Sequence, residues 1–358
     1  MGDRTDLYWV SPDFLASKHG ALGCPACHEG NALATEKSSA HQGLIKDPSA
    51  GKESGCSSCH PEIAAQYQNS IHATVKGYET VLKKRAGSRW AELEPIYQES
   101  CVGCHATCGH CHVSRHPSGG SGLIAGHRFF RRPPPDQTCG SCHGGRVSPE
   151  YYGKHEGQPA DVHFAKAGMD CFDCHNPREF HGSETPYQDR YPLISKVSCL
   201  DCHQDQFQAP SAIMAHDIHG KDIQCQVCHS ALYKGCYGCH IGKGSKSQLQ
   251  FKIGKNVRVD RPYRYTLLRH VPIVRDTFES KLKDALPDYD LIPNWKGTSP
   301  HNIQRVTYRN KTCQGCHGNS RIFLQKEDLA PGDPAANREV IVPHPPFKME
   351  RHPPRSAE

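Results

Sequence analysis

The sequence lacks long apolar segments and has little of the material from which an ordinary protein core is built. No run of 18 apolar residues occurs in its 358 residues, so we expect no transmembrane helix. Aromatic residues make up 8% of the chain, and only four methionines are present, while glycine numbers 32 and proline 27. Such a chain cannot bury enough apolar surface by itself to offset its conformational entropy.

Several enzyme signatures are missing as well. No serine-nucleophile, phosphate-loop or dinucleotide motif stands out, and glycine-rich pieces such as Gly119–Gly122 are typical of flexible loops. The absence of these motifs excludes the commonest nucleotide-dependent and hydrolytic enzyme classes.

The first residues, Met1–Trp9, lack the basic and apolar regions of a signal peptide.

Cysteine, in contrast, follows a strict pattern. All 20 cysteines fall in ten copies of Cys-x-x-Cys-His. Such a motif attaches c-type haem, because its two thiols form thioethers with the vinyl groups and its histidine ligates the iron. The predicted thioether residues are Cys24, Cys27, Cys56, Cys59, Cys101, Cys104, Cys108, Cys111, Cys139, Cys142, Cys171, Cys174, Cys199, Cys202, Cys225, Cys228, Cys236, Cys239, Cys313 and Cys316. The predicted proximal iron ligands are His28, His60, His105, His112, His143, His175, His203, His229, His240 and His317.

Two other uses of paired cysteines fit the pattern less well. Structural zinc also binds Cys-x-x-Cys, but a zinc site does not require a histidine directly after every second cysteine. A disulfide scaffold needs an even number of cysteines and has no use for the histidines. We therefore predict ten covalently attached haems as the cofactors.

Haem changes the expected fold and charge. Ten apolar macrocycles supply the missing core, so we expect a multihaem cytochrome c fold: mostly irregular loops with short α-helices and little β structure, wrapped round a chain of haems, and disordered without them. The formal charge of +6 would suggest anionic partners. Haem propionates add roughly −20 and ferric centres about +10, so the holoprotein becomes acidic and nucleic acid is not an expected partner.

Motif spacing suggests the organisation of the chain. Residues 1–245 carry motifs 1–9 as one haem-packed unit, 246–312 form a motif-free insert, 313–330 hold the tenth motif, and 331–358 form a proline-rich arm. Within the insert, Leu249–Ile253 and Tyr265–Ile273 are typical of strands of a short hairpin, and Thr277–Ala285 of a helix. The clearest helical pattern is Tyr78–Gln98. We expect the insert to donate ligands to haem.

The histidines outside the motifs are numerous enough to fill the second axial position of each iron. Of 25 histidines, fifteen lie outside the motifs, whereas His/Met ligation cannot be general with four methionines. The predicted distal ligands are His19, His41, His72, His127, His163, His181, His216, His219, His270 and His301. His216 is the least certain choice by spacing, with His116, His155 and His344 as alternatives, and His110 lies inside a motif as a bystander.

The ten motifs and stretches such as Asn69-Ser-Ile-His-Ala-Thr74 and Ser299-Pro-His-Asn-Ile303 resemble the multihaem, decahaem c-type cytochromes of periplasmic or extracellular electron transfer. The resemblance covers nearly the whole chain and implies conduction by sequential electron hops. It is very specific for haem attachment and much less specific for a subfamily. No flanking β-barrel domains are apparent, unlike in the outer-surface decahaem type.

Three functions follow as hypotheses. The first is an electron conduit without chemistry of its own, exchanging electrons with other redox proteins. The second is a filament of further copies of the chain, in which a terminal histidine such as His344, His352 or His19 ligates a haem of the next subunit. The third is an oxidoreductase that reduces a small nitrogen or sulfur oxyanion at one open haem. No catalytic residue is predicted. Because c-type haem is attached outside the cytoplasm, we expect export to the periplasm or cell surface, with the signal outside this numbering.

Overall fold

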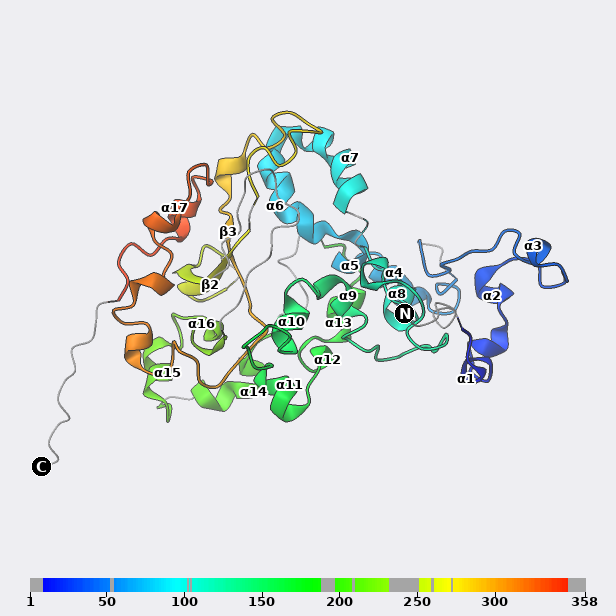
Figure 1. The fold of residues 1–358 in the computed structure, drawn as a ribbon, viewed down its shortest axis with the longest axis horizontal. Helices are drawn as coiled ribbons and strands as arrows, with labels where there is room; N and C mark the ends of the chain where they lie inside the picture. Colours follow the sequence, from blue (N-terminus) through cyan, green and yellow to red (C-terminus); the bar gives the residue numbers. More distant parts are fainter. Residues whose placement is uncertain are drawn as a thin grey trace, which may run out of the picture. The chain divides into compact units, whose positions relative to one another are not determined.

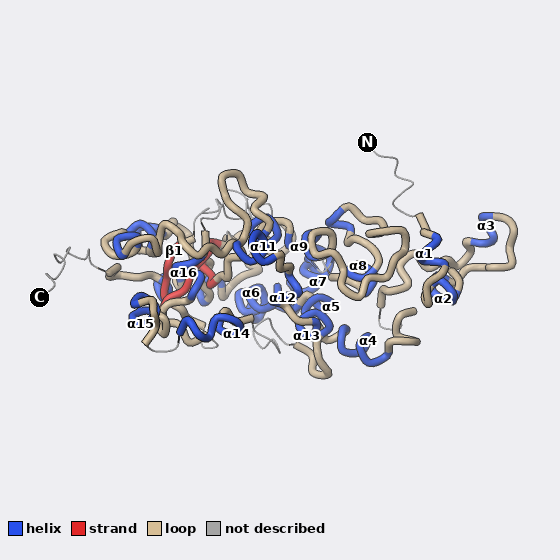
Figure 2. The backbone as a smooth tube through the Cα atoms, turned by 90° about the horizontal axis from the view of Figure 1, so that it is seen from below, coloured by secondary structure: helices blue, strands red, loops and turns tan. Residues whose placement is uncertain are grey.

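The computed structural model describes residues 9–51, 55–101, 103, 105–187, 197–207, 210–231, 251–258, 261–271 and 273–346. Figure 2 shows short helices joined by long loops, with one small group of strands. This content agrees with the expected loop-rich fold with little β structure. In the part described, no helix is both long and apolar enough to cross a membrane.

Backbone contacts divide the chain into two compact units. Unit 1 comprises residues 1–80, 97–148 and 170–196, and unit 2 comprises 81–96, 149–169 and 197–358. The domain limits expected from motif spacing stay a prediction. Figure 1 labels the helices and strands. The elements of unit 1 are α1 Pro12–Leu15, η2 Gly20–Leu22, α2 Pro25–His28, α3 Lys37–Ala40, α4 Pro61–Tyr67, α5 Ile71–Thr74, α8 Cys108–His112, η5 Pro117–Gly119, α9 Cys139–His143, α12 Cys171–Cys174 and α13 Pro177–His181.

Three helices run across a unit limit, namely α6 Lys76–Ala86, α7 Trp90–Cys101 and α10 Val147–Tyr151. The elements of unit 2 are η3 Gly87–Arg89, α11 Val162–Ala167, α14 Leu200–His203, η6 Gln204–Phe207, α15 Met214–His219, α16 Cys225–His229, β1 Lys252–Lys255, β2 Tyr265–His270, η7 Tyr289–Leu291, β3 Trp295–Gly297, η8 Cys313–Gly315, η9 Ser320–Ile322, η10 Lys326–Asp328 and α17 Asn337–Val340.

Most described motifs fold as a single helical turn that ends near the histidine. Helices α8, α9 and α16 coincide with complete motifs, and α2, α12 and α14 cover most of one. Residues three and four apart lie on one face of a helix, so one turn brings both thiols and the imidazole to the same side. The motif spacing therefore builds the attachment geometry locally.

The helical pattern of Tyr78–Gln98 is present as two helices rather than one. Helix α6 ends at Ala86, and α7 begins at Trp90 after the 3₁₀ turn Gly87–Arg89. Gly87 has φ +49°, and a Cβ there would lie 2.0 Å from an Asp288 carboxylate oxygen. Only glycine fits this joint, because the position is both left-handed and crowded.

The motif-free insert contributes the sheet of unit 2. Strands β1 and β2 pair antiparallel with Ile253 opposite Leu267, and β2 pairs antiparallel with β3. Leu267 and Leu324 are 0% exposed and Trp295 is 1% exposed. These strands occupy the segments expected to form the hairpin, except that Leu249–Gln250 lie outside the described residues.

The helix expected over Thr277–Ala285 is not formed. Residues 277–283 make consecutive turns, in which the N–H of Lys281 donates to the carbonyl of Phe278 at 2.8 Å. Asp284 has φ +51°, a conformation that a right-handed helix cannot include.

The described part of the proline-rich arm packs onto unit 2. Asn337 of α17 is 0% exposed, and its amide donates to the side-chain oxygen of Asn294 at 2.6 Å. Val340 and Val342 are also buried. These contacts anchor residues 331–346 on the core of this unit, while 347–358 lie outside the described residues.

Candidate functional site

Six motif histidines each face a histidine from outside the motifs. The ring centroids in unit 1 are 6.4 Å apart for His60 and His19, 5.8 Å for His28 and His127, and 6.0 Å for His112 and His181. Those in unit 2 are 6.0 Å apart for His203 and His163, 6.1 Å for His229 and His216, and 6.0 Å for His317 and His219. Every pair joins one predicted proximal ligand to one predicted distal ligand.

The separation of these rings is what a shared metal ion requires. Two metal–nitrogen bonds of about 2 Å, plus about 1 Å from each nitrogen to its ring centre, place coaxial imidazole centroids ~6 Å apart. Direct ring contact in the same region is shorter, because His19 stacks on Phe129 at 4.1 Å with planes 7° apart. The six pairs are spaced for an atom between them rather than for stacking.

Burial and mutual repulsion favour the neutral form of these imidazoles. Burial lowers the pKa of His127, His181 and His219, and the motif partner of each lowers it further. Burial also lowers the pKa of His229, with a smaller contribution from His216. Since iron binds neutral imidazole, the pairs are prepared as ligands.

Backbone carbonyls orient several motif rings. The Nδ1 atoms of His28, His112 and His229 lie 2.7, 2.5 and 3.2 Å from the carbonyl oxygens of Ile45, Phe130 and Gln304. Donation from Nδ1–H leaves the lone pair on Nε2, the nitrogen that can bind a metal. The chain thereby fixes the ring tautomer before any ligand is bound.

Two histidines instead meet buried carboxylates. Nδ1 of His163 lies 2.9 Å from Oδ1 of Asp161, and Nδ1 of His175 lies 2.8 Å from Oε2 of Glu179. Sequence reasoning missed both acids. The Asn176-Pro-Arg-Glu179 capping box directly after His175 was a usable signal for Glu179.

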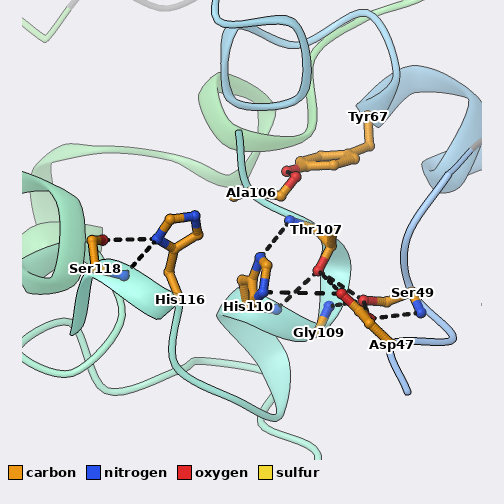
Figure 3. A network of polar contacts seen from close by, with 9 residues as sticks. All are labelled: Asp47, Ser49, Tyr67, Ala106, Thr107, Gly109, His110, His116 and Ser118. Carbon is orange, nitrogen blue, oxygen red and sulfur yellow. Dashed lines mark hydrogen bonds and ion pairs between the residues drawn. The ribbon is translucent and has the colours of Figure 1, made fainter. Parts of the chain in front are cut away.

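Histidine inside motif 4 has a different setting, which Figure 3 shows. The N–H of Thr107 donates to Nδ1 of His110 at 3.2 Å, and the Thr107 hydroxyl caps α8 and bonds Ser49 and Asp47. His110 therefore completes a capping box at the start of α8. Because its Nδ1 accepts this hydrogen bond, the ring proton lies on Nε2, the nitrogen that would otherwise bind a metal. This placement fits the bystander role.

The cysteines of different motifs also lie close together. No disulfide joins the cysteines described in motifs 1, 2, 4 to 8 and 10. The side chains of Cys56 and Cys108, and those of Cys139 and Cys171, are neighbours in unit 1, as are those of Cys199 and Cys225 in unit 2. The motifs are thus packed as neighbours, in pairs that are not always adjacent in sequence.

Comparison with known proteins gives one match. The family model described as cytochrome c554 and c-prime matches residues 55–144 and 183–230. These segments contain motifs 2 to 5, 7 and 8. The match supports a c-type cytochrome. No curated protein and no solved structure matches the chain.

A c-type cytochrome carries covalently bound haem c, and the described residues fit that group. Six of the described motifs place two thiols and one histidine on or next to a helical turn, and six opposing imidazoles stand at the spacing of a second axial ligand. Groups of three or more His, Cys, Asp or Glu that could hold a metal ion do not occur among the described residues. The donors are arranged in pairs.

The other predicted ligands have separate settings. His72 lies near His143 and His175, whose charges lower its pKa after burial has done most of the work. His41 is exposed, with Nδ1 2.6 Å from the Lys37 carbonyl.

Two further predicted ligands lie in unit 2. His270 packs on Trp295 at 5.2 Å with Nε2 4.0 Å from Asp333, and the His301 N–H donates to Glu150 at 2.7 Å. His105 is exposed. The ligand set of its haem stays a prediction.

Two of the motifs fall wholly or partly beyond the described structure. Motif 9, with Cys236, Cys239 and His240, lies outside the described residues, as does Cys104.

Proposed function

We propose that the chain is an exported electron-transfer protein that conducts electrons by hopping along about ten bis-histidine c-type haems, in the periplasm or at the cell surface. The observation that carries the proposal is the pairing of six motif histidines with six others at 5.8–6.4 Å. An iron with two imidazole ligands has no position for a substrate, and such haems are suited to electron transfer.

The cysteine contacts support a path from haem to haem. In unit 1, Cys27 lies near Cys56, Cys56 lies near Cys108, Cys111 lies near Cys142, and Cys139 lies near Cys171. These contacts connect motifs 1, 2, 4, 5 and 6 in that order.

In unit 2, Cys199 lies near Cys225 and Cys228 lies near Cys316, which connects motifs 7, 8 and 10. Haems attached to neighbouring thiols would lie close enough for electrons to pass from one iron to the next, with no substrate reacting at any iron.

Haem content and spin state test the proposal on the purified holoprotein. We expect a haem-to-chain ratio of about ten, with ferric electron paramagnetic resonance signals that are almost entirely low-spin. Replacement of His219 by methionine should raise the midpoint potential of one haem, since His/Met ligation raises potentials. The control is His110→Gln. The ring centroid of His110 lies 4.9 Å from that of His116, closer than the ~6 Å that an iron between two imidazoles requires, so this variant should leave the spin state unchanged.

Two other results would change the proposal. A stoichiometric high-spin ferric signal would contradict full bis-histidine ligation and favour the oxyanion-reducing oxidoreductase. Assembly into a filament with ligation between subunits is a separate prediction, which isolated particles in electron microscopy of native material would contradict.

A further inference from the structure

The two buried carboxylates that meet axial histidines have a common chemistry. Asp161 lies beside His163, the partner of the motif 7 histidine, and Glu179 lies beside His175, the motif 6 histidine. The side chains of Asp161 and Glu179 are 2% and 8% exposed. Each acid thus touches an expected iron ligand from a site shielded from water.

Asp161 accepts hydrogen bonds from several donors. Its Oδ1 accepts from the backbone N–H of His163 at 2.7 Å, and its Oδ2 accepts from the N–H of Ile303 at 2.6 Å. The Nδ1 of His163 adds a contact at 2.9 Å. Both oxygens of this buried carboxylate are therefore held by N–H groups, with Oδ1 against the imidazole.

Glu179 is fixed in a similar way from α13. Its Oε1 accepts from the N–H of Asn176 at 3.2 Å in the capping box of that helix, and its Oε2 receives the contact from His175. The same helix ends at His181, which faces His112 of motif 4. One short helix thus carries an acid for one haem and a ligand for another.

The remaining axial rings with a described Nδ1 contact lie on neutral acceptors. His28, His112, His216 and His229 have carbonyl oxygens of the backbone at 2.5–3.2 Å. A carboxylate draws the Nδ1 proton more strongly than a carbonyl does, which makes the ligand more basic. A more basic ligand, and the negative charge itself, favour ferric over ferrous iron.

We propose that Asp161 and Glu179 are positioning residues that lower the reduction potentials of the haems of motifs 7 and 6 below those of their neighbours. The inference rests on the proposed function. Each reduction adds one electron from a neighbouring haem, which is oxidised in turn, and the Nδ1 proton stays on its histidine. The two haems would then be the last to be reduced, so they set the energy profile along the path.

Potentiometric titration of the full holoprotein, followed by haem absorbance with dithionite as reductant, tests this role. Asp161→Asn and Glu179→Gln should each move one of the lowest midpoint potentials upward. The change in the ferric-to-ferrous preference should be about tenfold, which is about 59 mV for a one-electron couple. Low-spin ferric g-values of the same haem should change as its ligand becomes less basic. Asp161→Glu, which keeps the charge, should leave the midpoint potential close to its wild-type value.

A matched control is Asp328→Asn, which removes a partly buried carboxylate of unit 2 that bonds Lys252 rather than a histidine. It should leave the lowest potentials in place. The inference is overturned if the Asn and Gln variants keep the wild-type potentials, or if the control shifts them equally. Haem count and low-spin signals of the wild type are read from the same samples, so a failure of the proposed function is seen separately.

Discussion

The N-terminal part of unit 1 and the sheet of unit 2 solve the problem of a core differently. Between residues 9 and 51, Leu15 and Leu22 are 57% and 56% exposed and Leu33 is 95% exposed. In the sheet region, Leu267 and Leu324 are 0% exposed. The segment around motif 1 leaves apolar side chains for haem to cover, whereas the sheet of the insert packs against side chains such as Leu324 and Val340 to form a core made of protein alone.

The largest expected effect comes from withholding haem. In a chain made without haem attachment, residues 9–51 should lose ordered structure, because the protein itself leaves most of their apolar side chains exposed. Amides of β1, β2 and β3 should keep more protection in hydrogen exchange, since their contacts are between side chains. Equal protection of both regions in the haem-free chain would break the comparison.

Truncation of a core side chain in the sheet of unit 2 should have the next largest effect on stability. Leu267→Ala removes a fully buried side chain at the centre of the sheet and should cost about 2–5 kcal/mol in the free energy of unfolding. Leu291→Ala, at a 70% exposed position of the same unit, is the matched control and should cost much less. Denaturant unfolding of the holoproteins measures both. An equal loss for the two variants would contradict a core centred on the sheet.

The smallest expected effect is a loss of stability of unit 1 in acid. Burial, with smaller contributions from neighbouring histidines, lowers the pKa of His72 to about 4 from its ordinary 6.5. Between pH 6.5 and 4 the unfolded chain binds a proton at His72 that the folded chain does not. The free energy of unfolding should therefore fall as pH falls through this window.

Denaturation at several pH values measures this slope. His72→Gln should make it shallower, because the group that titrates only in the unfolded chain is gone. His344→Gln, at an exposed position, should leave the slope as it is. An unchanged slope in the His72 variant would show that other groups carry the acid sensitivity of unit 1.

Much of the candidate site was predictable because the haem-attachment motif is a contiguous stretch of residues. The motif fixes thiols and imidazole on one turn, and an excess of histidine signals second ligands. Six of the predicted distal histidines do lie opposite a motif histidine. Their partners could not be predicted, because His28 with His127 and His219 with His317 depend on how distant segments pack.

Features that depend on competition between local and tertiary contacts were not predictable. The pattern over Thr277–Ala285 suits a helix, yet turns and the left-handed Asp284 prevail. The acids at 161 and 179 resemble ordinary helix caps in the sequence. Their second role is visible only when the imidazole next to each is known to face another histidine.

The pairing of histidines also bears on the order of biogenesis. In unit 2 the three partners His163, His216 and His219 precede their motif histidines, so each waits in the growing chain when its motif is made. In unit 1, His28 depends on His127, which is synthesised much later. Because c-type haem is attached outside the cytoplasm, a chain exported only as far as residue 126 would carry the first motif without the histidine that lies opposite it.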